Sequence, residues 1–351
     1  MYCRMLKTAA ACIAAAVLLC PAADAEPVVS AKSAVLMDAA SGRVLWEKNA
    51  ENRSLIASTT KILTGLLIAE DCCLDDLVVI SEEAADIEGS SLYLQAGSQY
   101  SVKELLYGML LRSGNDAAAA LAIHHSGSIE SFAEAMNNKA QELGMRNSHF
   151  ENPHGLDSEQ HYSTALDLAK LSASAMENPV FYHAASSKTA EFEDRTYSNH
   201  NKLLWQLPGT VGIKTGYTKS AGRVLVSCVE RDGRRLIGVT ISAPDDWNDH
   251  RLMMEYGFYT YAQTPVAEAG KRYATVPLIG GAGSSVSCSV SETVFWPVRV
   301  GETVRVESDL PDFVYAPVFA GEMAGNLIIY LNEREIHRVP LFWCETVLEG
   351  L

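Results

Sequence analysis

The sequence of 351 residues predicts a mixed α/β (α+β) fold: one antiparallel sheet flanked by helices, followed by a small all-β domain. Strand-like runs stand near both ends of residues 26–262, and helical patterns fill the stretch between them. From residue 263 onward, short β-rich runs alternate with clusters of Gly, Pro, Asn and Asp. We therefore expect one domain over residues 26–262 and a second, β-rich domain over residues 263–351.

The first half of the larger domain begins with a hairpin and a buried helix. Apolar-rich runs at 33–38 and 43–48 are joined through the turn sequence Ala39-Ala40-Ser41-Gly42. The segment 58–70 has few polar positions, which predicts a largely buried helix. Residues 102–176 have mostly helical periodicity, so we expect a helical layer to follow.

Two features divide this helical layer. Ser113-Gly114 breaks it between predicted helices at 102–111 and 115–124, and another helix is expected at 129–143. Thr164-Ala165-Leu166-Asp167 resembles a capping box, which predicts the start of a further helix.

Strands return in the second half of the larger domain. We expect strands at 210–217, 223–230 and 235–242, the last two joined by Arg231-Asp232-Gly233, and then a helix at 246–261. The β-rich domain is expected to hold strands at 275–279, 286–290, 298–300, 303–307, 327–331 and 337–342.

The first 25 residues have the pattern of a cleaved secretory signal peptide. Arg4 and Lys7 form a basic start, residues 9–19 are apolar, and Ala23-Asp24-Ala25 offers a small-residue cleavage site. An uncleaved anchor helix is the alternative, but the apolar stretch is short for a bilayer. A lipoprotein form modified at Cys20 fits less well because Leu19 is bulky. We expect export to the cell wall, the periplasm or the extracellular space.

Charge and cysteine content exclude several classes of function. Removal of the two cations and one anion of residues 1–25 changes the formal net charge from −15 to −16. Such an acidic chain disfavours nucleic acid and anionic lipid as partners. Five cysteines remain without a CxxC pattern, and the nine histidines form no H-E-x-x-H motif, so we expect neither a disulfide framework nor a metal or other cofactor.

Three short motifs carry the chemistry: Ser58-Thr59-Thr60-Lys61, Ser113-Gly114-Asn115 and Lys214-Thr215-Gly216. Each alone occurs easily by chance. In this order, and at a helix start, an inter-helix loop and a strand, they indicate an active-site serine enzyme that uses lysine as its base.

The first motif supplies a nucleophile and its base. A serine hydroxyl needs a base at neutral pH, and Lys61 lies one helical turn after Ser58. An apolar environment lowers the pKa of an ammonium and makes the neutral amine accessible. The alternative interpretation is a helix-capping serine with a solvated lysine, which the apolar run after Lys61 weakens.

The other two motifs supply groups for proton transfer and binding. The Ser113 hydroxyl can relay a proton to a leaving amine, and the Asn115 amide can hold both the lysine and a substrate carbonyl. Lys214 and Thr215 can bind a carboxylate, and Gly216 lets a substrate backbone approach closely. Taken singly, a helix-capping Asn115 and an exposed Lys214 on a strand edge are the simpler interpretations.

These motifs and several flanking blocks resemble the D-alanyl-D-alanine carboxypeptidases of the peptidase S11 type, which are low-molecular-mass penicillin-binding proteins. The resemblance covers roughly residues 30–345 and implies a β-lactamase/transpeptidase-like domain with a β-rich C-terminal domain. The flanking blocks are Leu36-Met37-Asp38 with Ser41-Gly42, Glu88-Gly89-Ser90-Ser91, Asn152-Pro153-His154-Gly155-Leu156-Asp157, Asn201-Lys202-Leu203-Leu204-Trp205 and Ala243-Pro244-Asp245-Asp246-Trp247.

The resemblance implies a serine-type D-Ala-D-Ala carboxypeptidase that acts on peptidoglycan stem pentapeptides. Ser58 attacks the carbonyl between the last two D-alanines, and Lys61 accepts its proton. Water then hydrolyses the acyl-enzyme. Penicillins and other β-lactam antibiotics would acylate Ser58 and be released slowly.

The resemblance also assigns the remaining site residues. Ser113, with Asn115 and Lys214, helps to pass a proton to the departing D-alanine. Lys214 and Thr215 of the Lys-Thr-Gly motif hold the terminal carboxylate, and the backbone N–H groups of Ser58 and Tyr217 form the oxyanion hole.

The sequence departs from the family pattern at two places. Residues 345–351 are too short and too acidic for the amphipathic helix that anchors many members, so a membrane anchor is not evident. His200 stands where some relatives carry a basic residue near the substrate carboxylate; a surface histidine is the alternative.

Three other activities would use the same motifs. They are a peptidoglycan DD-endopeptidase, a β-lactamase and a non-hydrolytic penicillin- or peptidoglycan-binding module. A β-lactamase would need a further deacylation site, such as an E-x-x-L-N stretch, which the sequence lacks.

Overall fold

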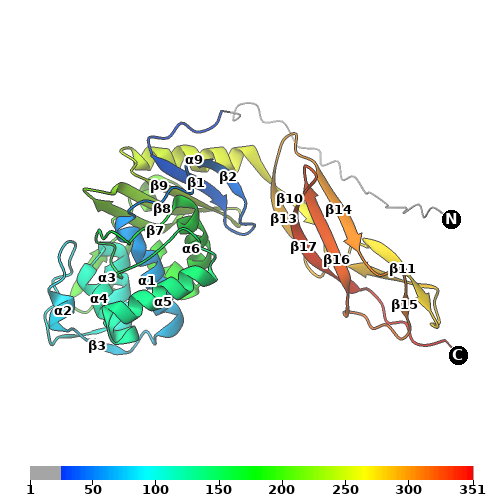
Figure 1. Ribbon diagram of the computed structural model, residues 1–351, viewed down its shortest axis with the longest axis horizontal. Helices are drawn as coiled ribbons and strands as arrows, with labels where there is room; N and C mark the ends of the chain where they lie inside the picture. Colours follow the sequence, from blue (N-terminus) through cyan, green and yellow to red (C-terminus); the bar gives the residue numbers. More distant parts are fainter. Residues whose placement is uncertain (1–24, 351) are drawn as a thin grey trace. The chain divides into compact units, whose positions relative to one another are not determined.

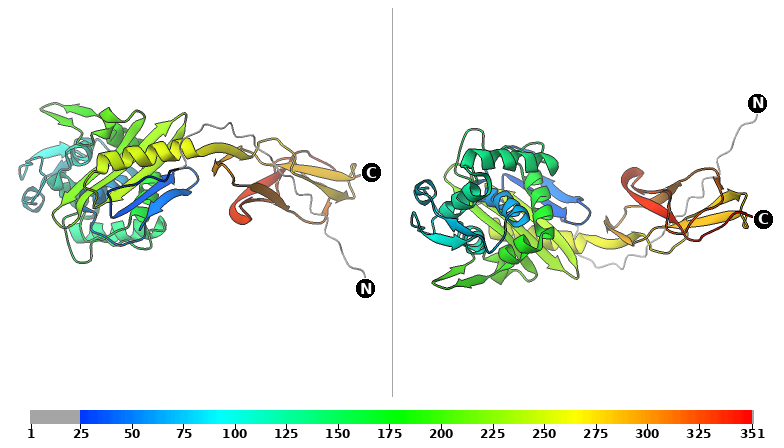
Figure 2. Two further views of the ribbon diagram at one scale, coloured as in Figure 1. Left: turned by 90° about the horizontal axis from the view of Figure 1, so that it is seen from above. Right: turned by 90° about the horizontal axis from the view of Figure 1, so that it is seen from below.

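A computed structural model describes residues 25–350. The predicted signal peptide therefore lies outside the described residues except for Ala25. The described chain divides into two compact units, residues 25–259 and residues 260–350, each with its own apolar core. Figures 1 and 2 show the elements of each unit.

The larger unit is built around one antiparallel sheet of five strands in the order β2-β1-β9-β8-β7. The first hairpin supplies two of them, and β1 pairs with β9 as well as with β2, so both ends of the unit's sequence meet in one sheet. The strands are β1 (Ser33–Asp38), β2 (Val44–Lys48), β7 (Thr210–Thr218), β8 (Gly222–Arg231) and β9 (Arg234–Ile241). The predicted fold class is confirmed.

Helices cover both faces of this sheet. Figures 1 and 2 show α9 (Asp246–Thr260) on one face and the other long helices on the opposite face. Those helices are α1 (Lys61–Asp71), α3 (Val102–Arg112), α4 (Asn115–Ser126), α5 (Ile129–Glu142) and α6 (Ala165–Glu177). Thr164 caps α6 as the sequence predicts, because its hydroxyl accepts the backbone N–H of Asp167.

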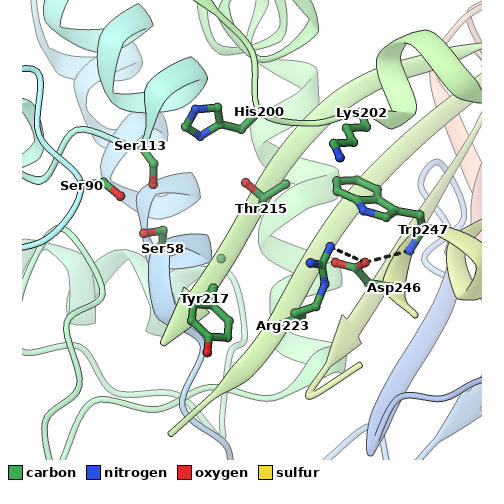
Figure 3. A pocket seen from close by; sticks show the side chains of 11 residues that line it. Ser58, Ser90, Ser113, His200, Lys202, Thr215, Tyr217, Arg223, Asp246 and Trp247 are labelled. Atoms are coloured by element: carbon green, nitrogen blue, oxygen red, sulfur yellow. Dashed lines mark hydrogen bonds and ion pairs between the residues drawn. The ribbon is translucent and has the colours of Figure 1, made fainter. Parts of the chain in front are cut away.

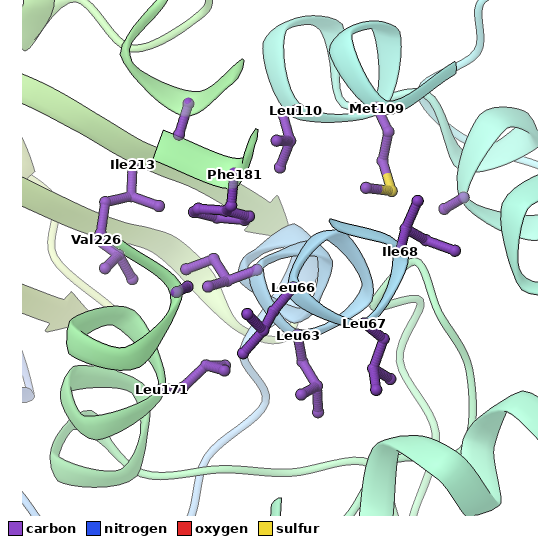
Figure 4. Packing of buried hydrophobic residues seen from close by; sticks show 14 of the residues in the cluster. Leu63, Leu66, Leu67, Ile68, Met109, Leu110, Leu171, Phe181, Ile213 and Val226 are labelled. Atoms are coloured by element: carbon purple, nitrogen blue, oxygen red, sulfur yellow. The ribbon is translucent and has the colours of Figure 1, made fainter. Parts of the chain in front are cut away.

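Helix α1 lies at the centre of the core. Leu63, Leu66 and Ile68 are fully buried, and Figure 4 shows side chains from α3, α6, β7 and β8 around them. A helix that is apolar on all sides is stable only when it is enclosed. This burial fixes the residues at the start of α1 beneath the edge strand β7.

Several short elements of the larger unit were not predicted. They have three to eight residues each, too few for a clear periodic signal. They are β3 (Leu77–Val79), α2 (Glu82–Ala85), β4 (Gln99–Ser101), α7 (Pro179–Ser186), β5 (Thr189–Phe192), β6 (Arg195–Ser198) and α8 (Leu203–Gln206).

The smaller unit is all-β, as the sequence predicts. It pairs β10 (Tyr261–Ala267) with β13 (Val294–Arg299) and has a six-stranded sheet in the order β14-β16-β17-β12-β11-β15. The sequence missed the start of β13 because Pro297 weakens a strand pattern. The six strands are β11 (Ala274–Ile279), β12 (Ser285–Ser289), β14 (Val304–Asp309), β15 (Val314–Tyr315), β16 (Met323–Leu331) and β17 (Arg334–Trp343).

Within residues 25–350, none of the helices is both long and apolar enough to cross a membrane.

Candidate active site

Ser58 lies in a short 3₁₀ turn, η1 (Ala57–Thr60), and not in the first turn of an α-helix as the sequence suggested. The α-helix begins at Lys61. Side chains at positions i and i+3 of a 3₁₀ turn lie above one another, and Nζ of Lys61 is 3.1 Å from Oγ of Ser58. The tighter turn therefore places the hydroxyl and the amine in direct contact.

The Lys61 side chain is fully buried and surrounded by oxygen atoms. Besides its contact with Ser58, its Nζ donates to Oδ1 of Asn115 at 2.6 Å and to the backbone carbonyl of His154 at 2.7 Å. Burial lowers the pKa of Lys61 well below its usual value, and the charge of Lys214 lowers it further, while Asp116 opposes the shift. The site therefore favours a neutral amine beside Ser58.

The Ser-Gly-Asn motif forms the junction between α3 and α4. Ser113 ends α3 in the left-handed conformation, with φ of 65°, and Asn115 is the first residue of α4. Oγ of Ser113 accepts a hydrogen bond from Nζ of Lys214 at 3.1 Å. Nδ2 of Asn115 donates to the carbonyl of Glu88 at 2.6 Å, which fixes Oδ1 toward Lys61.

The Lys-Thr-Gly motif lies on β7, the edge strand of the sheet. Lys214 is 1% exposed, so the alternative of an exposed strand-edge lysine is wrong. Its Nζ donates to Ser113 and to the carbonyl of Thr215 at 2.8 Å. Burial lowers the pKa of Lys214 to about 7.

Close packing favours glycine at position 216. A Cβ atom at this position would lie 3.1 Å from the backbone nitrogen of Ser58 and 3.2 Å from Cβ of Ala57. The missing side chain lets β7 approach the turn that carries Ser58. Tyr217 follows at the rim of the site, and its side chain is 66% exposed.

These residues border a cleft of about 340 Å³. Figure 3 shows Ser58, Ser90 and Ser113 on one side, Thr215 in the middle, and Lys202 with Trp247 on the other side. Buried Lys61, Lys214 and Asn115 lie beneath this lining. The cleft is lined by Ser58, Ser90, Ser113, His200, Lys202, Thr215, Gly216, Tyr217, Arg223, Asp246 and Trp247.

Part of this lining was not assigned from the sequence. Ser90, Lys202 and Trp247 fall within blocks that carry the family resemblance, so a signal was present without a stated role. Arg223 pairs with Asp246, with 2.7 Å between Nη2 and Oδ1. His200 lines the cleft at an exposed position, and partial desolvation followed by the charges of Arg112 and Lys214 lowers its pKa.

The segment 152–157 supports the Ser58 turn from behind. Pro153 accepts a hydrogen bond from Thr64 at 2.6 Å, and His154 accepts from Lys61, both through backbone carbonyls. Gly155 has φ of 86°, and a Cβ atom there would collide with the carbonyl of Ala57. A backbone carbonyl leaves no residue-type signature, so the sequence could not reveal this contact with the lysine.

A second histidine reaches the same turn. Nε2 of His161 is 2.8 Å from Oγ1 of Thr60, and its Nδ1 accepts the backbone N–H of Glu151. The second contact places the ring proton on Nε2, which then donates to Thr60. Burial lowers the pKa of His161 to about 4, so the ring is neutral at physiological pH.

Fold and site together define a class: a serine–lysine pair beneath the edge strand of an antiparallel sheet is the arrangement expected of an active-site serine enzyme. Among residues 25–350, no group of three or more His, Cys, Asp or Glu side chains is placed to hold a metal ion.

Comparison with known proteins identifies the family. Residues 21–245 match the peptidase S11 family model, described as D-alanyl-D-alanine carboxypeptidase. Residues 261–349 match the model of the penicillin-binding protein 5 C-terminal domain. The chain belongs to the peptidase S11 family and is a serine-type carboxypeptidase.

Relatives and solved structures agree with this assignment. The chain is 35% identical to the D-alanyl-D-alanine carboxypeptidase DacF of Bacillus subtilis over 89% of this chain and 84% of the relative. It is 33% identical to DacC of Escherichia coli over 92% and 86%. The structure of penicillin-binding protein 5 from Haemophilus influenzae matches 93% of this chain and 99% of its own, with a TM-score of 0.79 and 30% identity.

Proposed function

We propose that this protein removes the terminal D-alanine from peptidoglycan stem pentapeptides through an acyl-enzyme on Ser58. The observation that carries the proposal is the environment of Lys61. A neutral amine has two N–H donors and one lone pair. The carbonyl oxygens of Asn115 and His154 occupy the two donors, which leaves the lone pair for the hydroxyl of Ser58.

Acylation follows from this arrangement. Lys61 takes the proton of Ser58 as Oγ attacks the carbonyl carbon of the penultimate D-alanine. The oxygen–carbon bond forms, and the carbon–nitrogen bond to the terminal D-alanine breaks. The backbone N–H groups of Ser58 and Tyr217 are the proposed donors to the oxyanion.

The leaving amine needs the proton that Lys61 took from Ser58, and Ser113 can relay it: its hydroxyl gives a proton to the amine and accepts one in return, so that Lys61 is neutral again for the second step. The Ser113 hydroxyl is within hydrogen-bond distance of Nζ of Lys214, and it borders the same cleft as Ser58. Asn115 keeps Lys61 in place during this step. A water molecule then attacks the ester carbonyl with Lys61 as base, which releases the shortened peptide and restores Ser58.

Substrate orientation is assigned to β7. Lys214 and Thr215 bind the terminal carboxylate by charge and by hydroxyl. Gly216 leaves the peptide backbone free to approach the strand edge. Because an anion stabilises the ammonium form, a bound carboxylate raises the pKa of Lys214 above its value in the free enzyme.

β-Lactam antibiotics are proposed as covalent inhibitors, because they offer a reactive carbonyl and a carboxylate to the same groups. We place the reaction outside the cytoplasm. The basic start, the apolar run and the cleavage-site residues of 1–25 support export.

One experiment tests the nucleophile. Ser58→Ala is expected to abolish both labelling by a fluorescent penicillin and release of D-alanine from a D-Ala-D-Ala peptide, with an unchanged thermal unfolding curve. Ser131→Ala, which removes an exposed hydroxyl of α5 away from the cleft lining, serves as the matched control and retains labelling. Labelling of the Ser58→Ala protein would refute the assignment, and wild-type labelling without D-alanine release would indicate a binding module.

A further inference from the structure

Ser90 of the cleft lining belongs to a segment with no helix or strand of its own, residues 88–94, which we call the Ser90 segment. Its first half is bonded to Asn115. The backbone N–H of Asn115 donates to the carbonyl of Ser90 at 2.7 Å, and its Nδ2 donates to the carbonyl of Glu88 at 2.6 Å. The position of this segment is therefore coupled to the residue that holds Lys61.

The second half of the Ser90 segment is bonded to Asp116, a fully buried residue with no role in the proposed reaction. Oδ2 of Asp116 accepts the hydroxyl of Ser91 at 2.7 Å and the backbone N–H groups of Leu92 and Leu94 at 2.9 and 3.1 Å. Oδ1 accepts the N–H groups of Leu92 and Ala117 at 3.0 and 2.9 Å. Both oxygens act only as acceptors, which is the pattern of an ionised carboxylate.

Apolar packing also fixes the position of the Ser90 segment. The side chain of Leu92 fills the space left by two glycines of the helical layer, Gly108 and Gly114. A Cβ atom at Gly114 would lie 2.7 Å from Cγ of Leu92, and one at Gly108 would collide with its Cδ1. Nη1 of Arg195, on β6, donates to the carbonyl of Leu92 at 2.9 Å. Among these contacts, Asp116 alone bonds three residues of the segment.

We propose that Asp116 is a positioning residue of the active site: its carboxylate holds the Ser90 segment against the start of α4. This keeps Ser90 in the cleft lining and Asn115 directed at Lys61. The inference rests on the proposed function, because its consequence is the geometry in which Ser58 is acylated. A misplacement of about 1 Å in such a group lowers rates by about 100-fold.

The negative charge of Asp116 adds an effect that a purely mechanical support would lack. It raises the pKa of Lys61, against burial and the charge of Lys214. His154 and His161 are the other titratable groups that interact with Lys61, and both are neutral near pH 7 because burial lowers the pKa of each. Loss of the Asp116 charge therefore lowers the pKa of Lys61, so the neutral amine forms at lower pH.

Asp116→Asn tests the proposal, with Asp167→Asn as the matched control. The Asp116 carboxylate is surrounded only by hydrogen-bond donors. An amide replaces one acceptor oxygen with an NH₂ group, which faces those donors without a hydrogen bond. Asp167 is also buried near a helix start and accepts from the backbone N–H of Asn147 and the hydroxyl of Ser148, but it does not line the cleft.

Both variants are compared with wild type in D-alanine release, in penicillin acylation across pH and in thermal unfolding. We expect kcat/KM to fall 10- to 100-fold in Asp116→Asn and less than twofold in Asp167→Asn. The pH at which penicillin acylation rises should move downward only in Asp116→Asn.

An Asp116→Asn protein with kcat/KM within twofold of wild type and an unmoved pH profile would overturn the proposal. Where this variant fails to fold, Ser91→Ala decides instead, because it removes one donor from a partly exposed position. A three- to tenfold loss of kcat/KM supports the proposal, and an unchanged value overturns it. Failure of the proposed function is a separate outcome, since wild type would then release no D-alanine.

Discussion

The two units of this protein bury very different side chains. The unit of residues 25–259 encloses two lysines, three histidines and several aspartates at less than 9% exposure. Within residues 260–350, Ser287 is the only buried residue of a polar or charged type. The core of this unit consists of Val, Leu, Ile, Trp, Ala and Cys side chains.

The difference supports placing the proposed chemistry in the larger unit. A buried charge costs several kcal/mol unless hydrogen bonds and charges compensate it, or unless the group becomes neutral. The larger unit bears this cost at Lys61 and Lys214, whose pKa values are both lowered by burial. The described residues of the smaller unit include no buried charged side chain, and its core consists of apolar side chains.

The largest effect on activity should follow from loss of a buried lysine of the larger unit. Lys61→Ala removes the proposed base, and general base catalysis contributes about 10²- to 10⁴-fold. We expect penicillin acylation, followed by stopped-flow fluorescence, to slow about 1,000-fold or more. The control Lys170→Ala removes a partly exposed lysine paired with Asp167 and should acylate at the wild-type rate. An unchanged rate in Lys61→Ala would show that another group is the base.

An intermediate effect is expected at the second buried lysine. Lys214 binds a carboxylate only when protonated, and its pKa is about 7 in the free enzyme. As pH rises through 7 the cation is lost, so kcat/KM for D-alanine release should decline with a midpoint near 7. The decline in kcat should come at higher pH because bound substrate raises the pKa.

The same lysine can be tested by substitution. Lys214→Ala should lower kcat/KM about 100-fold, since truncation of one partner of a buried charge pair costs 2–5 kcal/mol, and should abolish the decline near pH 7. A decline that persists in Lys214→Ala would assign this titration to a different group.

The smallest effect on activity is expected in the β unit, although the loss of stability should be large. Leu327 is fully buried in the core of residues 260–350, and Leu→Ala at such a position costs about 2–5 kcal/mol. Urea unfolding followed by circular dichroism should show a transition of the smaller unit at lower urea concentration and an unchanged transition of the larger unit. At urea concentrations below both transitions, D-alanine release should equal that of wild type. Leu66→Ala, in the core beside the site, should destabilise the other transition. Loss of activity in folded Leu327→Ala protein would show that the smaller unit also contributes to activity.

Long periodic elements were predicted well, and short ones were not. The hairpin at residues 33–48, the helices from 102 to 142 and the strands β7 to β9 have patterns that span enough residues to be recognised. Helix α7 and the hairpin of β5 and β6 are short, and their stability comes from packing against the rest of the unit. Local sequence carries little information about such elements.

Local sequence determined the chemical groups and the secondary-structure elements that hold them. These are a serine and a lysine one turn apart, an asparagine at the start of a helix, and a strand with the Lys-Thr-Gly motif. Local sequence could not determine the state of the two lysines, because their bonds cross 54, 93 and 101 positions of the chain. Desolvation, the acceptor carbonyl of His154 and the support from Asp116 arise only when distant segments pack together. Tertiary structure therefore converts an ordinary ammonium into a candidate base, since burial and not residue type sets its pKa.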